Sequence, residues 1–302
     1  GGTYVDGVEW FNRYQWENTV GPIEQRPGWH YDDIWGYWTT DGLGYYELLI
    51  LAELLDAEPI WVLNCGISLT VSIPTGDLQP YIQSGLDSLE FAIGDVSTPW
   101  GLDLQGFQSV EQSVACVHGS STALCNQLCG TVHTDEVQHY AWQAIGNEQS
   151  QPQYTDNYIA FYETLKASYP NITLIANSPM GSSAPTDMYD FHTYNDPFWF
   201  IDNQFYFDSI DRSTSPLIFN SEYAVYGEWG GTGNLNGSLA EAVWMTALER
   251  NSDLVPMASY APLFVNTNDR TWNPDAIVFN SNQTYGTPSY WNQVMFANYA
   301  GL

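Results

Sequence analysis

The segment Ala144-Ile145-Gly146-Asn147-Glu148 ends an apolar run that begins at Tyr140. A second segment of the same kind, Ile218-Phe219-Asn220-Ser221-Glu222, ends a run that begins at Leu217. Nearly continuous apolar runs of this length are typical of parallel strands that are buried on both faces. The two segments therefore predict two strands of a parallel sheet, each with a carboxyl group at its carboxyl end.

Four further runs have the same character, and stretches with helical character separate all six. The four runs are Pro59 to Asn64, Ile172 to Asn177, Met188 to Tyr194 and Val255 to Ala261. The predicted helices are Gly44 to Asp56, Leu78 to Ile93, Thr155 to Tyr169, Trp199 to Ile210, Ser238 to Asn251 and Ser289 to Asn298. Alternation of strand and helix predicts an α/β fold with a parallel sheet. No repeat or linker divides the sequence, which predicts one domain over residues 1–302.

Polar side chains gather where the predicted strands end, for example at Asn64, Asn177 and His192. That distribution favours a (β/α)8 TIM barrel, in which catalytic side chains project from the carboxyl ends of the strands. A closed barrel of this type needs eight strands, whereas the sequence shows six. Because parallel sheets avoid open edges, we expect the remaining strands to come from another chain or from an N-terminal segment.

The charge balance excludes several classes of protein. The 302 residues include 35 Asp and Glu but only 6 Lys and Arg, so the formal net charge is −29. A nucleic-acid-binding protein relies on a basic patch to neutralise phosphates, and a protein that binds anionic membranes relies on the same kind of patch. No apolar run reaches the ~18 residues of a membrane-spanning helix. Since 44% of the residues are hydrophobic, we expect a packed globular protein that binds neither nucleic acid nor membranes.

Cysteines and glycosylation sequons favour a secreted, extracellular protein. The four cysteines are Cys65, Cys116, Cys125 and Cys129, and sequons occur at Asn171, Asn236 and Asn282. A zinc site built from Cys125, Cys129, His118 and His133 would match no standard spacing. A local disulfide that joins Cys116 to Cys125 or Cys129 is the favoured alternative, and the sequons would accept glycan in a secreted protein.

The two strand-end glutamates suit a retaining glycosidase. Such an enzyme needs one carboxylic acid to protonate the leaving oxygen and one carboxylate as nucleophile, about 5 to 5.5 Å apart. We assign these roles to Glu148 and Glu222. Asn147 precedes the first glutamate and is placed to bind a substrate hydroxyl. His192 and Tyr194 alternate along one strand, so both point to the same face, where the tyrosine hydroxyl would bind the nucleophile.

Trp272 and Asn273, after the last predicted strand, are candidates for the rim of the substrate site.

Other chemistries lack their motifs. The sequence contains no G-x-S-x-G, P-loop or dinucleotide-binding motif, and its five histidines form no H-E-x-x-H pair. A serine hydrolase, a nucleotide-dependent enzyme and a zinc protease are therefore unsupported.

Several longer motifs resemble glycoside hydrolase family 51, whose best-known members are α-L-arabinofuranosidases. The resemblance extends over most of the chain and is poor from about Asp95 to His139. The motifs that carry it are residues 16–22, 26–28, 35–44, 145–148, 221–224, 249–253, 260–263 and 272–275.

The resemblance implies a retaining enzyme on a (β/α)8 barrel. It implies that Glu148 is the acid/base at the end of the fourth strand and Glu222 the nucleophile at the end of the seventh. It also implies that Asn147 and Tyr194 contact the sugar or the nucleophile, and that no cofactor takes part. Members of the family remove terminal arabinofuranosyl units from arabinoxylan, arabinan or their oligosaccharides.

The sequence departs from the family pattern at three places. Thr3 stands where the family has a sugar-binding Asn, and Gln149 stands where an acidic residue usually follows the Gly-Asn-Glu motif. The family's first strand, nearly all of its second strand and its C-terminal sandwich segment are not found in this sequence. The resemblance therefore implies that the chain supplies about strands 3 to 8 of the barrel. We therefore expect a partner chain, an N-terminal fragment of the same precursor that stays bound to this one.

The predicted function is release of terminal α-L-arabinofuranosyl units from a polysaccharide or oligosaccharide. Two alternatives remain open from the sequence. One is an endo-acting β-glucanase or xylanase on the same fold, and the other is a carbohydrate-binding protein without turnover.

Overall fold

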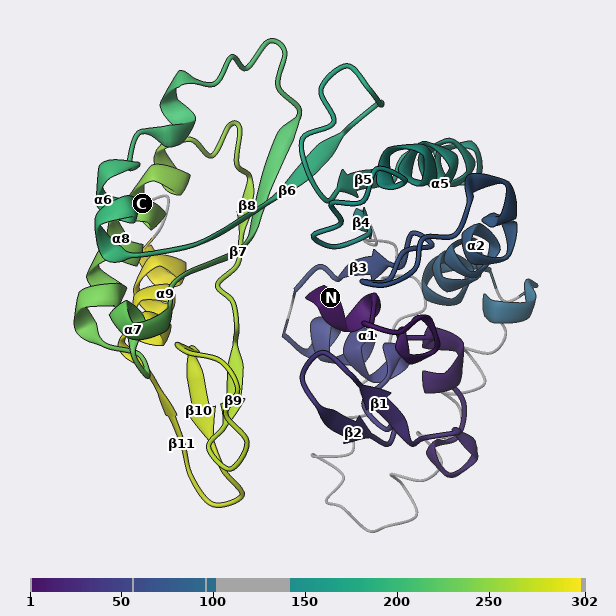
Figure 1. Cartoon of the computed structure of the whole chain (residues 1–302), viewed down its shortest axis with the longest axis horizontal. Coiled ribbons are helices and arrows are strands. Elements are labelled where there is room, and N and C mark those ends of the chain that lie inside the picture. The colour runs from purple at the N-terminus through teal and green to yellow at the C-terminus, as the bar shows by residue number, and fades with distance from the viewer. Residues whose placement is uncertain (1, 56, 96, 102–141, 300–302) are drawn as a thin grey trace. The chain divides into compact units, whose positions relative to one another are not determined.

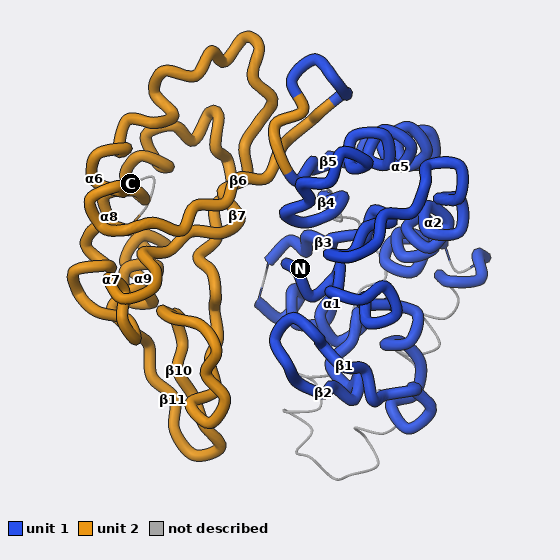
Figure 2. Tube along the Cα trace, viewed as in Figure 1, with its two compact units in different colours: residues 1–177, 181–185 blue, residues 178–180, 186–302 orange. Residues whose placement is uncertain are grey.

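A computed structural model describes residues 2–55, 57–95, 97–101 and 142–299 of the chain. The chain divides into two compact units, shown in different colours in Figure 2. Unit 1 takes in residues 1–177 and 181–185, and unit 2 takes in residues 178–180 and 186–302. Each unit has its own parallel strands and helices. The single domain over residues 1–302 stays a prediction.

Unit 1 is built on three parallel strands. Their order is β3 (Ile60–Leu63), β4 (Trp142–Ile145) and β5 (Thr173–Ala176), with each strand in register with the next (Figure 1). The α-helices described in this unit are α1 (Tyr45–Leu54), α2 (Gln79–Ile93) and α5 (Tyr154–Ser168). A hairpin of β1 (His30–Asp32) and β2 (Tyr37–Thr39) and the 3-10 turns η1 (Gly2–Val5), η2 (Trp10–Asn12), η3 (Trp16–Thr19), η4 (Ile23–Gln25) and η5 (Thr75–Asp77) complete the described part.

Close packing of α2 and α5 on the strands forms the core of unit 1. Gly85 of α2 faces β3 and α5, and a Cβ added there would lie 2.9 Å from Leu63 Cδ1 and 3.6 Å from the Phe161 ring. A larger residue at this position would force the Leu63 side chain to move. Leu89, Phe161 and Leu165 have no exposed surface, so this packing fixes β3 and β4 beneath the helices.

Unit 2 also has three parallel strands. They are β6 (Met188–Asn195), β7 (Leu217–Val225) and the short β8 (Met257–Ala258), in that order. Its helices are α6 (Pro197–Asp202), the 3-10 turn η7 (Tyr206–Ser209), α7 (Gly227–Gly230), α8 (Leu235–Arg250) and α9 (Pro288–Tyr299). A small sheet adds β9 (Phe264–Asn266), β10 (Ile277–Phe279) and β11 (Thr284–Gly286), in which β10 is central.

An aromatic cluster around Trp244 joins the helices of unit 2 to β7. The indole is fully buried, and its ring centroid lies 5.2 Å from that of Phe207 and 5.7 Å from that of Phe200. Its Nε1 donates a hydrogen bond of 2.8 Å to Oδ1 of the buried Asn220 in β7. Aromatic contacts of this kind stabilise a fold by more than the burial of their surface alone. The cluster therefore anchors the strand two residues before Glu222.

All six predicted strands are present, but one predicted helix is wrong. The expected helix over Trp199 to Ile210 is instead the short α6 followed by the separate turn η7. Asp196 caps the start of α6 by accepting hydrogen bonds from the Phe198 and Trp199 amides at 2.9 and 3.0 Å. Asn203 ends the helix, since its side chain donates to the Trp199 carbonyl at 2.8 Å and competes with helical bonding.

No helix within the described ranges is long and apolar enough to cross a membrane. The predicted cysteine pairing and the zinc alternative concern Cys116, Cys125, Cys129, His118 and His133, which all lie outside the described residues. Cys65, at the end of β3, is a buried free thiol.

A buried carboxyl links α8 to the end of β7. Glu241 has no exposed surface, and its Oε1 accepts a hydrogen bond from the Val225 amide at 2.9 Å. Burial raises the pKa of this carboxyl from 4.5 to about 7, and its hydrogen bonds oppose the change only in part. Between these two values the folded protein holds a proton that the unfolded chain has lost. The stability of the fold therefore falls as the pH rises through this window.

We expect Glu241→Gln to remove this pH dependence. Between pH 5 and pH 7.5, the free energy of unfolding of the parent should fall by about 2 kcal/mol more than that of the variant. Urea unfolding at the two pH values measures the difference. Glu249→Gln, on the exposed side of the same helix, is the matched control and should follow the parent. An equal fall in Glu241→Gln would show that another group carries the effect.

Candidate active site

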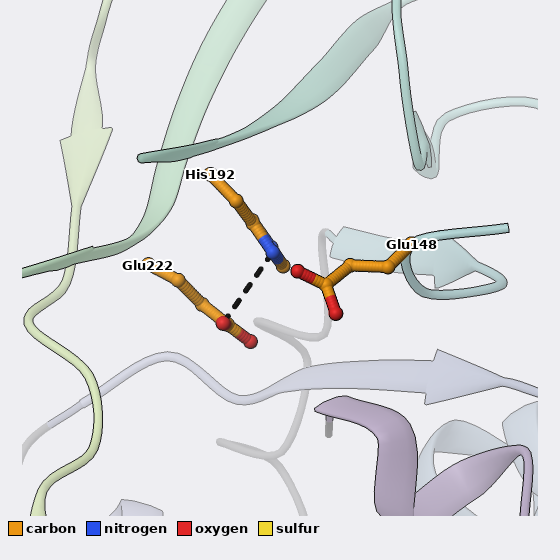
Figure 3. Close-up of side chains that lie close together, drawn as sticks. All are labelled: Glu148, His192 and Glu222. Atoms are coloured by element: carbon orange, nitrogen blue, oxygen red, sulfur yellow. Dashed lines mark ion pairs between the residues drawn. The ribbon is translucent and has the colours of Figure 1, made fainter. Parts of the chain in front are cut away.

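Three polar side chains of β6 share one face of the strand. Asp190, His192 and Tyr194 are separated by two residues each, and alternate residues of a strand point the same way. Tyr194 Oη donates a hydrogen bond of 2.7 Å to Oε2 of Glu222 in β7. His192 Nδ1 lies 3.4 Å from the same oxygen, and Figure 3 shows this ion pair as a dashed line. Two neighbouring strands therefore hold one carboxylate oxygen of Glu222 between a phenol and an imidazole.

A register shift between β6 and β7 makes this contact possible. Asp190 pairs with Phe219, but His192 pairs with Glu222, so β7 contains one more residue than β6 over this stretch. Bulges of this kind bend a strand, re-aim its side chains and are frequent next to active sites. Here the bulge lets both Ser221 and Glu222 reach the β6 face, although consecutive strand residues normally point to opposite faces.

Trp272 lies beside this group, whereas Asn273 is occupied with other partners. The Trp272 ring centroid is 5.3 Å from that of Tyr194 and 6.0 Å from that of Tyr226, which it stacks against at 19°. Asn273 Oδ1 accepts a hydrogen bond from Arg270, and its carbonyl accepts one of 3.3 Å from the Gly227 amide. Trp272 thus packs against Tyr194, the residue that binds the Glu222 carboxylate. The hydrogen bonds of Asn273 shape the loop that carries Trp272.

In unit 1, Asn147 and Glu148 follow β4 on a tight turn. Gly146 has φ 75°, and a Cβ added there would lie 2.9 Å from Cys65 Sγ, so the turn requires glycine. Asn147 is 5% exposed, and its Nδ2 has no hydrogen-bond partner among the described residues. Glu148 is exposed and has φ 50°. Left-handed backbone at a residue other than glycine costs energy and is frequent at functional sites.

A buried polar pair holds the other end of this turn. Gln149 Nε2 donates a hydrogen bond of 2.6 Å to Asp6 Oδ2, and Asn64 donates one of 3.2 Å to Asp6 Oδ1. Burial raises the pKa of the Asp6 carboxyl well above its usual range, although the bond from Gln149 opposes the shift. Thr3 positions Asp6, because its carbonyl accepts hydrogen bonds from the Asp6 and Gly7 amides at 3.1 and 3.2 Å.

The predicted site residues therefore fall into two groups. The structure brings His192, Tyr194, Glu222 and Trp272 together in unit 2, with Asn273 in a neighbouring loop. Thr3, Asn147 and Glu148 belong to unit 1. The two ring nitrogens of His192 each lie close to a carboxyl group, Nε2 to Asp190 and Nδ1 to Glu222.

Sequence reasoning missed Asp190, Ser221 and Asp6. His192 Nε2 lies 2.8 Å from both Asp190 Oδ2 and Ser221 Oγ. The two-residue spacing of Asp190 and His192 could have predicted that they share a face of the strand. The bulge that brings Ser221 to the same face has no recognisable pattern in the sequence. Asp6 meets Gln149 across 143 positions of sequence, a contact that depends on the fold alone.

Comparison with known proteins places these residues in one family. Residues 1–103 and 137–212 match the family described as the α-L-arabinofuranosidase 1 domain, and residues 221–302 match the α-L-arabinofuranosidase C-terminal domain. The first match ends before β7, and the second match begins within that strand.

Two curated relatives are longer than this chain. α-L-Arabinofuranosidase 1 of Arabidopsis thaliana is 46% identical over 307 residues, which cover 100% of this chain and 41% of that protein. An extracellular exo-α-L-arabinofuranosidase of Streptomyces chartreusis is 33% identical, over 95% of this chain and 33% of its own length. The chain therefore spans less than half the length of these relatives.

Solved structures agree with the sequence relatives. The arabinose-bound MgGH51 α-L-arabinofuranosidase matches with a TM-score of 0.80 and 30% identity, over 99% of this chain and 46% of that one. The α-L-arabinofuranosidase of Thermotoga maritima matches with a TM-score of 0.70 at 18% identity and thus shows the fold alone. The predicted fold, part of a (β/α)8 barrel, is confirmed. The chain belongs to the α-L-arabinofuranosidases of glycoside hydrolase family 51.

Proposed function

We propose that this chain carries the catalytic residues of a retaining, exo-acting α-L-arabinofuranosidase. The observation that carries the proposal is the Glu222 carboxylate at the end of β7, with Oε2 bound by Tyr194 at 2.7 Å and lying 3.4 Å from His192 Nδ1. A donor that binds the ionised form of a carboxyl favours that form. The contacts therefore support an ionised, oriented nucleophile.

In the first step of the proposed reaction, a Glu222 oxygen attacks the anomeric carbon of the terminal arabinofuranosyl unit. The bond from that carbon to the glycosidic oxygen breaks, and the carboxyl proton of Glu148 passes to the leaving oxygen. In the second step, the Glu148 carboxylate takes a proton from water, whose oxygen attacks the same carbon and releases Glu222. Two inversions at one carbon retain its configuration. No metal or cofactor takes part.

The substrate contacts remain part of the proposal. The buried Asn147, whose Nδ2 lacks a partner among the described residues, would donate to a sugar hydroxyl next to Glu148. Tyr194 and Trp272 form the aromatic border of the Glu222 side of the site. Thr3 and Asn273 are proposed as further contacts, each by a short polar side chain.

The proposal extends to location and assembly. A relative from Streptomyces is described as extracellular, and the acidic composition and the sequons are in keeping with secretion and glycosylation of this protein. The second chain, an N-terminal fragment of the same precursor, stays a prediction. Intact mass and N-terminal sequencing of purified material test it, because a fully active single species of 34.0 kDa would contradict it.

Digestion of arabinoxylan by the full-length protein tests the proposed function. We expect free arabinose as the first and main product, because an exo-acting arabinofuranosidase removes single terminal units. Chromatography of the released sugars measures it, with boiled protein as control. Mixed oligosaccharides without free arabinose would favour the endo-acting alternative. Retention on the polysaccharide without release of reducing ends would favour a binding protein.

A further inference from the structure

His192 lies between two carboxyl groups of unit 2. Its Nε2 is 2.8 Å from Asp190 Oδ2 and 2.8 Å from Ser221 Oγ, and its Nδ1 is 3.4 Å from Glu222 Oε2. Ser221 Oγ also donates a hydrogen bond to Asp190 Oδ1. The side chains of His192 and Asp190 are each 13% exposed. Limited access of water strengthens hydrogen bonds and charge interactions in this group.

The donors and acceptors fix the proton on Nε2. An ionised aspartate only accepts hydrogen bonds, and a serine hydroxyl has one hydrogen to give. Ser221 gives its hydrogen to Asp190, so both oxygen atoms near Nε2 are acceptors. His192 Nε2 must therefore carry a hydrogen, which the two oxygens share.

The second ring nitrogen then decides the charge of the ring. If Nδ1 carried a lone pair, it would face the Glu222 carboxylate at 3.4 Å and repel it. If Nδ1 carries a hydrogen, the ring is an imidazolium that interacts favourably with a carboxylate on each side. Two negative charges close to a histidine favour its protonated, positively charged form. Asp190 faces the ring from β6 and Glu222 faces it from β7, where Tyr194 also binds Glu222.

We propose that Asp190 and Ser221 are positioning residues that hold His192 as an imidazolium with its Nδ1–H directed at Glu222. The inference rests on the proposed role of Glu222 as nucleophile. The cation keeps the carboxylate ionised and oriented before it attacks the sugar. When the sugar ester breaks in the second step, the negative charge that returns to Glu222 meets the same cation. The His192 proton is not transferred in either step.

Kinetics of Asp190→Asn provide the first test. We expect kcat/KM for an aryl α-L-arabinofuranoside to fall about 10- to 100-fold, the loss usual when the carboxylate that orients a metal-bound histidine is removed. The acid limb of the pH profile of kcat/KM should move to higher pH, because a neutral His192 no longer stabilises the Glu222 carboxylate. Loss of the Asp190 charge alone would move that limb to lower pH. The direction of the shift therefore separates the two explanations.

Two further variants complete the kinetic test. Ser221→Ala should move the acid limb in the same direction with a smaller loss of activity, and it carries the test if Asp190→Asn does not fold. Asp202→Asn removes the same charge from an exposed position in α6 and should behave as the parent. An acid limb that is unmoved, or moved to lower pH, in both Asp190→Asn and Ser221→Ala would overturn the proposal.

Nitrogen NMR of the full-length protein, labelled at histidine, tests the charge of His192 without any turnover. The His192 signals are assigned by their loss in His192→Gln. At pH 7 we expect both ring nitrogens to be protonated in the parent and the ring to be neutral in Asp190→Asn. A neutral ring in the parent would overturn the proposal. If the ring is charged but no arabinoside is hydrolysed, the proposed function fails and the charge assignment stands.

Discussion

Replacing Glu222 by alanine should lower kcat/KM for an aryl α-L-arabinofuranoside about 10⁴-fold or more, because removal of a nucleophile leaves only binding and the remaining groups to act. The parent side chain has its Oε2 bound by Tyr194 at 2.7 Å, so the variant loses an oriented group and not a mobile one. Initial rates measured by release of the aryl alcohol give the ratio. Activity within tenfold of the parent would refute the assignment.

Azide separates loss of the nucleophile from loss of the fold. The truncated side chain leaves room for a small anion on the face from which Glu222 attacks. Azide there should displace an activated aryl alcohol directly, in one inversion, and give the β-arabinofuranosyl azide. Glu249→Ala, an exposed position on α8, is the control and should keep parent activity without azide. An inactive Glu222→Ala that azide does not rescue, although it is folded, would point to a different role for Glu222.

The strands of the barrel were predictable because their segments are rich in apolar residues, and the last three residues of both β4 and β5 are buried. Runs such as Ile172 to Asn177 are mainly apolar, and that signal does not depend on distant contacts. The hairpin β1–β2 and the small sheet β9–β11 were missed for the opposite reason. Their strands are three residues long and include exposed positions such as Tyr37 and Phe264. So short a strand shows no reliable periodicity.

The site was predictable as far as it follows the period of a strand. His192 and Tyr194 share a face because they alternate, and Tyr194 binds Glu222 as their strand-end positions suggested. Ser221 breaks that rule, since the register shift between β6 and β7 brings it to the same face as Glu222. A bulge adds one residue without a distinctive composition. The contact of Ser221 with His192 therefore follows from the structure and not from the pattern.

The buried carboxyls show a second limit of sequence reasoning. Glu241 and Asp6 look like ordinary surface acids in a chain with 35 acidic residues, yet both are almost fully buried. Each carboxyl accepts a hydrogen bond from a distant segment. Glu241 accepts one from the Val225 amide, and Asp6 accepts one from the Gln149 side chain. Charged residues are rarely buried without such a partner. Only the fold reveals which acids have one.

Replacing Glu148 by alanine should give losses that depend on the leaving group. An arabinoxylan oligosaccharide has a poor leaving group that needs a proton, so kcat/KM should fall about 10²- to 10⁴-fold, the usual contribution of general acid catalysis. A 2,4-dinitrophenyl arabinofuranoside needs no protonation, and its kcat/KM should fall far less. The basic limb of the pH profile should disappear for the oligosaccharide. Equal losses on both substrates would show that Glu148 binds substrate and is not the acid.

Azide also distinguishes the roles of the two glutamates. In Glu148→Ala the nucleophile is intact, so the sugar ester forms and azide replaces water in the second step. The product should be the α-arabinofuranosyl azide, with retained configuration, whereas Glu222→Ala should give the β anomer. Glu148→Gln keeps the size of the side chain but cannot donate a carboxyl proton. Glu163→Ala, at an exposed position of α5, is the control. Opposite anomers from the two alanine variants would assign nucleophile and acid/base separately, whereas the same anomer from both would contradict the double displacement.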